Sequence, residues 1–107
     1  MSTSLNGSQA TLKQLEAISG EALTLSGLLR SIREGEELSQ VAFAKQLGVS
    51  RQYICDIEHK RRFVSPKAAY EYAQVLGYSP EQFVRLALQD ELDNFSIPFI
   101  VRVQDAA

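Results

Sequence analysis

Four positions between residues 44 and 57 restrict how this chain can fold. Ala44 is small enough to lie where two helix backbones approach closely, and Gly48 can take the left-handed conformation that ends a helix. Ile54 and Ile57 follow three residues apart, so they share one face of the next helix. This spacing predicts two short helices that cross steeply at a tight turn, with both isoleucines facing the interior.

Helix signals also flank this pair on both sides. Before it, apolar side chains recur at helical spacing: Leu25, Leu28, Leu29 and Ile32. Serine is favoured at helix N-caps, and a serine precedes each later helical segment: Ser39, Ser50, Ser65 and Ser79. Proline follows the last two serines, at the first helical position. We therefore expect a mainly α fold of five helices, at about residues 24–35, 39–48, from 50 onward, 65–77 and 79–92.

The C-terminal end has a different pattern. Apolar residues occupy alternate positions, which is the period of a strand: Phe95, Ile97, Phe99, Val101 and Val103. We therefore expect a C-terminal β-strand after the five helices. A lone strand cannot satisfy its own backbone, so it must pair with the segment near residues 11–19, with the same strand of a second subunit, or with another protein. We favour pairing between subunits.

The chain has the length of one typical domain. We expect a flexible or partly ordered segment at residues 1–20, where Leu12, Leu15 and Ile18 fit a short helix or a strand. The helical domain is expected over residues 21–94. Residues 95–107 are then the strand used for dimerisation.

The net charge of −2 conceals an uneven distribution. Residues 45–67 carry six basic and two acidic side chains, which gives +4, whereas the segments before and after are acidic. Because a local basic patch attracts phosphate more effectively than the whole-chain charge repels it, nucleic acid remains a candidate partner.

The side chains opposite the two isoleucines are suited to DNA. Two helices joined in this way form a helix-turn-helix, and the second of them can enter the major groove of DNA, which is about 12 Å wide. Gln52, opposite the isoleucines, suits adenine, and Arg51, on the flank of the same first turn, suits guanine; Cys55 and Asp56 complete the candidate base contacts. Asp56 either accepts from a cytosine amino group or orients Gln52, one turn earlier. The candidate phosphate contacts are Gln40, Tyr53, Lys60, Arg61 and Arg62, although Tyr53 could instead pack at the helix edge.

With these residues in place, the chain resembles the lambda-repressor-like, Xre/Cro family of DNA-binding domains over about Leu25 to Leu92. The motifs that carry the resemblance are LLRSIR at 28–33, LSQVAFAKQLGVS at 38–50, RQYICDIE at 51–58 and SPKAAYEYAQVLGY at 65–78. Two features depart from the family pattern: no glycine follows Glu58, and the expected strand lies outside the common five-helix core.

The resemblance implies a partner and a mode of action. It implies a homodimer that binds double-stranded DNA at an inverted repeat, as a transcriptional repressor or as an antitoxin that also binds a toxin protein. It places Gln40, Arg51, Gln52 and Asp56 where family members touch DNA. It also implies an ion pair between Arg33 and Glu58, which ties the first helix to the end of the recognition helix.

Other classes of function find little support in the sequence. No nucleophile–base pair, carboxylate pair or phosphate-binding glycine loop indicates an enzyme, so we expect no catalysis and no cofactor. Cys55 is the one cysteine and His59 the one histidine, so we expect neither a disulfide nor a metal site. The chain contains no apolar run long enough to cross a membrane and no signal-peptide pattern, so we expect a cytoplasmic protein.

Overall fold

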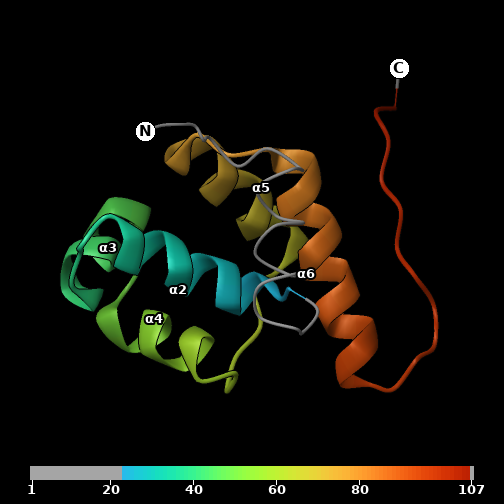
Figure 1. The fold of residues 1–107 in the computed structure, drawn as a ribbon, viewed down its shortest axis with the longest axis horizontal. Helices are drawn as coiled ribbons and strands as arrows, with labels where there is room; N and C mark the ends of the chain where they lie inside the picture. Colours follow the sequence, from blue (N-terminus) through green and yellow to red (C-terminus); the bar gives the residue numbers. More distant parts are fainter. Residues whose placement is uncertain (1–22, 107) are drawn as a thin grey trace.

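The computed structural model describes residues 23–106, which form five helices (Figure 1). The helices are α2 (Leu25–Gly35), α3 (Gln40–Leu47), α4 (Arg51–Glu58), α5 (Pro66–Leu76) and α6 (Pro80–Asn94). The mainly α class and the five predicted helices are confirmed. The expected N-terminal segment, residues 1–20, lies outside the described residues, and so do Leu12, Leu15 and Ile18.

Every helix begins with a hydroxyl cap. The Thr24 side chain accepts a hydrogen bond from the Gly27 N–H at 3.0 Å. Before each of the other helices, a serine side chain likewise accepts a hydrogen bond from the backbone N–H three residues later in the chain: Ser39, Ser50, Ser65 and Ser79. Each bond satisfies one of the N–H groups that a helix leaves free in its first turn. The starts of the helices are therefore fixed by local chemistry.

Every helix also ends in the same way, with a residue in the left-handed region. Glycine takes this position after α3 and α5, where Gly48 has φ of 73° and Gly77 has φ of 77°. After the other three helices, the position is filled by Glu37, Lys60 and Ser96. In each case the next amide bonds back to a carbonyl of the last helical turn, as the Val49 N–H does to the Ala44 carbonyl at 2.9 Å.

The helices pack around one apolar core. α5 lies against α6, and α3 lies against α4, while α2 runs through the centre and contacts both α4 and α6 (Figure 1). The largest fully buried side chains come from four of the helices: Leu25, Leu28, Phe43, Ile54, Ile57, Phe83 and Leu86. The core thus holds one side of α4 against α2 and α3, and the other side of α4 faces solvent.

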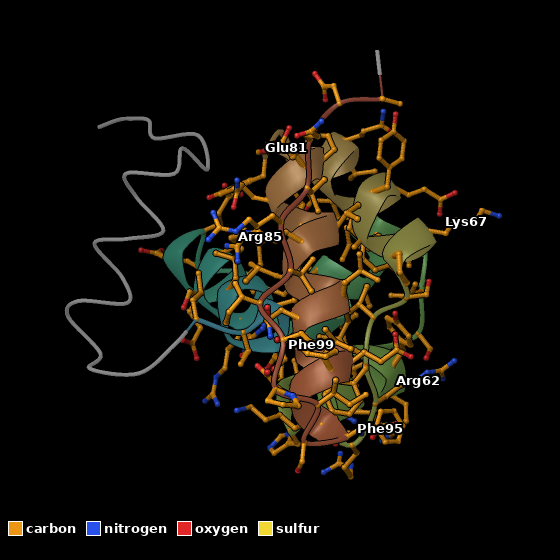
Figure 2. The ribbon with its side chains drawn as sticks, turned by 90° about the vertical axis from the view of Figure 1, so that its right-hand side faces the viewer. Arg62, Lys67, Glu81, Arg85, Phe95 and Phe99 are labelled. Carbon is orange, nitrogen blue, oxygen red and sulfur yellow. The ribbon has the colours of Figure 1, made fainter. Side chains whose placement is uncertain are left out.

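The expected C-terminal strand is wrong, because residues 23–106 contain no β-strand. Residues 95–106, here called the C-terminal segment, instead run beside α6 (Figures 1 and 2). The Gln89 side chain takes the place of a partner strand: its Nε2 donates to the Phe99 carbonyl at 2.9 Å, and its Oε1 accepts from the Val101 N–H at 2.7 Å. The alternation of apolar residues was misleading because a strand also needs a backbone partner, which the described chain does not provide.

A tight turn also interrupts the alternation. The Phe99 N–H bonds to the Ile97 carbonyl at 2.9 Å, which makes a three-residue turn around Pro98. As a result the five apolar residues do not share one face: Phe95 and Phe99 are each 66% exposed, whereas Val101 and Val103 are half-buried.

Candidate nucleic-acid interface

The turn between α3 and α4 decides which side of α4 faces outward. Ile54 and Ile57 are only 2% and 1% exposed, and Ala44 is buried on α3, against which α4 packs. Successive helix residues are turned by about 100°, so Gln52 lies nearly opposite the buried isoleucines and Arg51 lies on the flank between the two sides; both side chains are exposed.

On this outward side, Asp56 connects two neighbours. Its Oδ1 accepts from Gln52 Nε2 at 2.9 Å and from the Arg61 guanidinium, also at 2.9 Å. These hydrogen bonds, of which the one from Gln52 contributes most, hold the pKa of the Asp56 carboxyl below its usual range. The hydrogen bond between Asp56 and Arg61 also raises the pKa of Arg61. The four candidate base contacts, Arg51, Gln52, Cys55 and Asp56, all lie on this one helix.

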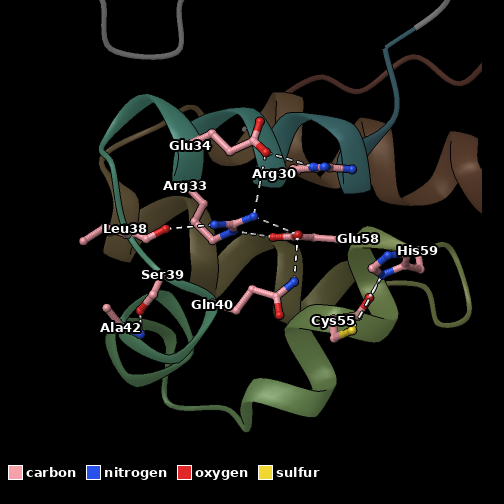
Figure 3. Close-up of polar contacts among 10 residues, drawn as sticks. All are labelled: Arg30, Arg33, Glu34, Leu38, Ser39, Gln40, Ala42, Cys55, Glu58 and His59. Carbon is pink, nitrogen blue, oxygen red and sulfur yellow. Dashed lines mark hydrogen bonds and ion pairs between the residues drawn. The ribbon is translucent and has the colours of Figure 1, made fainter.

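Behind α4, Glu58 forms a half-buried polar network (Figure 3). Arg33 Nε donates to Glu58 Oε2 at 2.6 Å, and Arg33 Nη2 donates to Glu58 Oε1 at 3.1 Å. Arg33 Nη1 also donates to the Leu38 carbonyl at 2.8 Å, so one guanidinium ties α2 both to the end of α4 and to the loop before α3. This network fixes α4 relative to α2.

Gln40 joins the same network. Its Nε2 donates to Glu58 Oε1 at 3.1 Å, so the amide that was expected to hold a phosphate is engaged with a carboxylate (Figure 3). Burial alone would raise the pKa of Glu58, but the hydrogen bonds from Arg33 and Gln40 outweigh it and hold the pKa below its ordinary value. Glu58 is therefore kept ionised, as a fixed anchor for the start of α3.

Beyond α4 the chain turns through Lys60, whose φ is 60°. The Arg61 N–H bonds to the Asp56 carbonyl at 2.8 Å, which completes the end of the helix without the glycine that the family pattern has there. Lys60, Arg61 and Arg62 are all exposed. The basic run thus leaves α4 at its C-terminal end.

Tyr53 lies between this run and α5. The guanidinium carbon of Arg62 lies 4.9 Å from the centre of the Tyr53 ring, which is a cation–π contact. From α5, the buried Tyr72 donates its hydroxyl hydrogen to the Tyr53 hydroxyl at 3.2 Å. Burial raises the pKa of Tyr72 well above its usual value, and the bond to Tyr53 adds to this rise. The Tyr53 hydroxyl hydrogen therefore stays available to another acceptor.

Cys55 is half-buried and lies beside His59. The His59 Nδ1 is 2.8 Å from the Cys55 carbonyl and 3.6 Å from its sulfur, and Arg61 Nη2 lies 3.3 Å from the same sulfur (Figure 3 shows the Cys55–His59 pair). These contacts occupy the side chains at the C-terminal end of α4. Among residues 23–106, no three His, Cys, Asp or Glu side chains are grouped so that they could bind a metal ion.

The exposed charges near α4 are mostly basic. Lys45 on α3, Arg51 on α4 and Lys67 on α5 are exposed in addition to the run after α4. Arg62 and Lys67 project toward the same side of the molecule in Figure 2. The two acidic side chains of the region are paired, Asp56 with Arg61 and Glu58 with Arg33, so neither presents an unbalanced charge.

Sequence reasoning missed two polar partners in this region. Gln40 was assigned to a phosphate, and its bond to Glu58 joins residues 18 apart in the chain, which no local pattern reveals. Tyr72 was assigned no polar role from the sequence. A signal did exist for Tyr72, because a buried tyrosine hydroxyl needs a hydrogen-bond partner.

Comparisons with known proteins agree with this geometry. A family model described as helix-turn-helix matches residues 29–83, just over half of the chain. The crystal structure of the hypothetical transcription factor NHTF from Neisseria is similar at 28% identity and a TM-score of 0.50, over 67% of this chain and 80% of that one. No curated protein matches. Within residues 23–106, none of the helices combines the length and apolar character required to span a bilayer. This chain belongs to the helix-turn-helix family, in its lambda-repressor-like, Xre-type form.

Proposed function

We propose that the protein is a sequence-specific transcriptional regulator that inserts α4 into the major groove of double-stranded DNA. The burial of Ile54 and Ile57 carries this proposal, because it leaves Arg51 and Gln52 exposed at the start of a short helix. Membership of the helix-turn-helix family and the likeness to a hypothetical transcription factor support it.

In this arrangement the first turn of α4 reads the sequence. Arg51 pairs with the O6 and N7 atoms of guanine, and Gln52 pairs with the N6 and N7 atoms of adenine. Cys55, one turn later, contributes an apolar contact. Each good bidentate pair discriminates against a wrong base by about 1–3 kcal/mol.

The flanking groups hold the phosphates. Lys60 and Arg62 leave the end of α4 as exposed cations, and the hydroxyl hydrogen of Tyr53 is free to bond a phosphate oxygen. At the start of α3, the Gln40 side chain is held by Glu58, so its contribution is its backbone N–H, together with the positive end of the helix dipole.

The DNA-binding proposal is tested by selection from a random pool of DNA duplexes at about 150 mM salt, which is physiological ionic strength. The expected result is enrichment of one short sequence whose two halves form an inverted repeat. Recovery of unselected DNA, with the same affinity as the starting pool, would contradict sequence-specific binding.

We further propose that the regulator acts as a homodimer and represses transcription by occupying its site. Phe95, Phe99 and Ile100 expose large apolar surfaces on the C-terminal segment, and a second copy would bury them. Two-fold symmetry then places the two α4 helices about 34 Å apart, one turn of DNA.

Sedimentation of the purified protein tests the dimer. Wild type should sediment as a dimer and Phe99→Ser as a monomer, whereas Val75→Ser, which alters an exposed apolar residue on α5, should leave the dimer intact. A monomeric wild type would contradict the proposal. A monomer that co-purifies with a second protein through the C-terminal segment would instead favour the antitoxin alternative.

A further inference from the structure

We infer that Asp56 is a positioning residue that fixes Gln52 and Arg61 for base recognition, without itself reading a base. The inference rests on the proposed function, because it concerns how α4 meets DNA. It starts from three side chains on and just after α4 that bond to one another: Gln52, Asp56 and Arg61.

The chemistry of the Asp56 contact determines how Gln52 is oriented. Gln52 Nε2 lies 2.9 Å from Asp56 Oδ1, and an ionised carboxylate can only accept hydrogen bonds. The amide nitrogen of Gln52 must therefore face Asp56, and its oxygen must face away. A free glutamine would populate both amide orientations, since the two ends differ little in size.

This orientation matters for the base that Gln52 can pair with. Adenine offers a donor at N6 and an acceptor at N7, so the glutamine must present its oxygen to one and its nitrogen to the other. Because Asp56 accepts only one of the two Nε2 hydrogens, the second remains for N7. A fixed amide thus admits one order of donor and acceptor along the groove and disfavours the reverse order.

Asp56 also holds Arg61 on the surface of α4. Arg61 Nε and Nη2 both lie 2.9 Å from Asp56 Oδ1, and Nη2 lies 3.3 Å from the Cys55 sulfur. With the guanidinium retained here, Arg61 lies beside the candidate base contacts and is not free to follow the phosphate backbone. The carboxylate balances its charge, so the pair adds little to non-specific attraction.

The substitution Asp56→Asn tests the inference. Asparagine keeps the size of the side chain but can donate as well as accept, so it releases the Gln52 amide orientation and removes one negative charge. Affinity for random DNA is expected to rise about threefold, and the ratio of specific to random affinity to fall about tenfold, within the range of one bidentate pair. Glu91→Gln, an exposed residue of α6 with the same charge change, is the control and should leave the ratio unchanged.

Removing both positioned side chains separates positioning from direct readout. If Asp56 acts only through Gln52 and Arg61, Asp56→Asn should not alter the base preference at any position of the site in a background that carries both Gln52→Ala and Arg61→Ala. A changed preference in that background would show that Asp56 contacts a base, and would overturn the inference. So would an unchanged ratio for Asp56→Asn alone, with wild type still selecting its site. Failure of wild type to select any site would instead overturn the proposed function, and this inference with it.

Discussion

Arg33 Nε and Glu58 Oε2 lie 2.6 Å apart, although 25 residues separate them in the chain. The Glu58 side chain is only 3% exposed, and the Arg33 side chain is 14% exposed. This contact joins the middle of the fold, α2, to the end of the helix that we propose enters DNA. The position of α4 therefore depends on a shielded ion pair as well as on apolar packing.

Replacing Glu58 by alanine should destabilise the protein strongly. The change leaves the Arg33 guanidinium shielded from water without its carboxylate, which costs about 3 kcal/mol in the free energy of unfolding. Glu34→Ala is the matched control, because Glu34 pairs with Arg30 at an exposed position and should contribute less than about 0.5 kcal/mol. Urea unfolding at pH 7 measures both, and equal losses would contradict the structural role of the ion pair.

The same pair makes stability sensitive to acid. The folded-state pKa of Glu58 lies below its ordinary value of 4.5, so its contribution is present above that pH and is lost as the pH falls through the folded-state pKa. Urea unfolding between pH 3 and pH 6 should therefore show a steeper loss toward low pH for wild type than for Glu58→Gln. Parallel profiles for the two proteins would contradict this account.

Asp90 should have the opposite effect on stability. Burial raises its pKa to about 6, and the negative charge of Asp93 adds to the rise; the Leu25 N–H, Lys60 and Arg85 lower the pKa but do not reverse the rise. A raised carboxyl pKa stabilises the fold at pH below the unfolded value, and that stabilisation is lost as the pH rises through about 6.

The substitution Asp90→Asn tests this sign. Asparagine keeps an oxygen for the Leu25 N–H, which lies 2.9 Å from Asp90 Oδ2, but carries no charge to desolvate. The free energy of unfolding at pH 7.5 should rise by about 1 kcal/mol, a small value because solvent still reaches the carboxyl. The gain should shrink toward pH 4. A loss of stability at pH 7.5 would show that the ionised form is favoured.

Lys60 occupies a backbone conformation that glycine adopts at lower cost. Its φ of 60° lies in the left-handed region, so Lys60→Gly should raise the free energy of unfolding by about 0.5–1 kcal/mol. Gly48→Ala, at φ of 73°, should lower it by a similar amount, although an added Cβ would meet no neighbour there. Thermal unfolding monitored by circular dichroism measures both changes. A destabilised Lys60→Gly would mean that its side chain stabilises the fold by more than this strain.

The helices could be predicted from sequence because their limits are set locally. Ser39 and Ser50 bond to amides three residues ahead, and Gly48 ends α3 by its own backbone freedom. The C-terminal segment could not be predicted in this way. Its alternation resembles a strand, but the outcome depends on Gln89, which lies 10 residues from Phe99 and is marked by no pattern.

In the candidate site too, some features could be predicted from the local sequence and others depend on tertiary packing. The spacing of Ile54 and Ile57, which the sequence displays directly, puts Gln52 on the exposed side of α4, and Arg51 is exposed on the flank of the first turn. The bond between Gln40 and Glu58 and the one between Tyr72 and Tyr53 depend on how separate helices pack. Such contacts appear only when the tertiary structure is known.

The central claim is that the exposed start of α4 reads DNA sequence. It is tested most directly by measuring the affinity of wild type, Arg51→Ala and Arg62→Ala for the selected site and for random DNA, over a range of salt concentrations. Arg51→Ala should lose about 1–3 kcal/mol on the selected site and much less on random DNA, whereas Arg62→Ala should weaken both alike and flatten the salt dependence. Equal losses for Arg51→Ala on the two DNAs would contradict the claim.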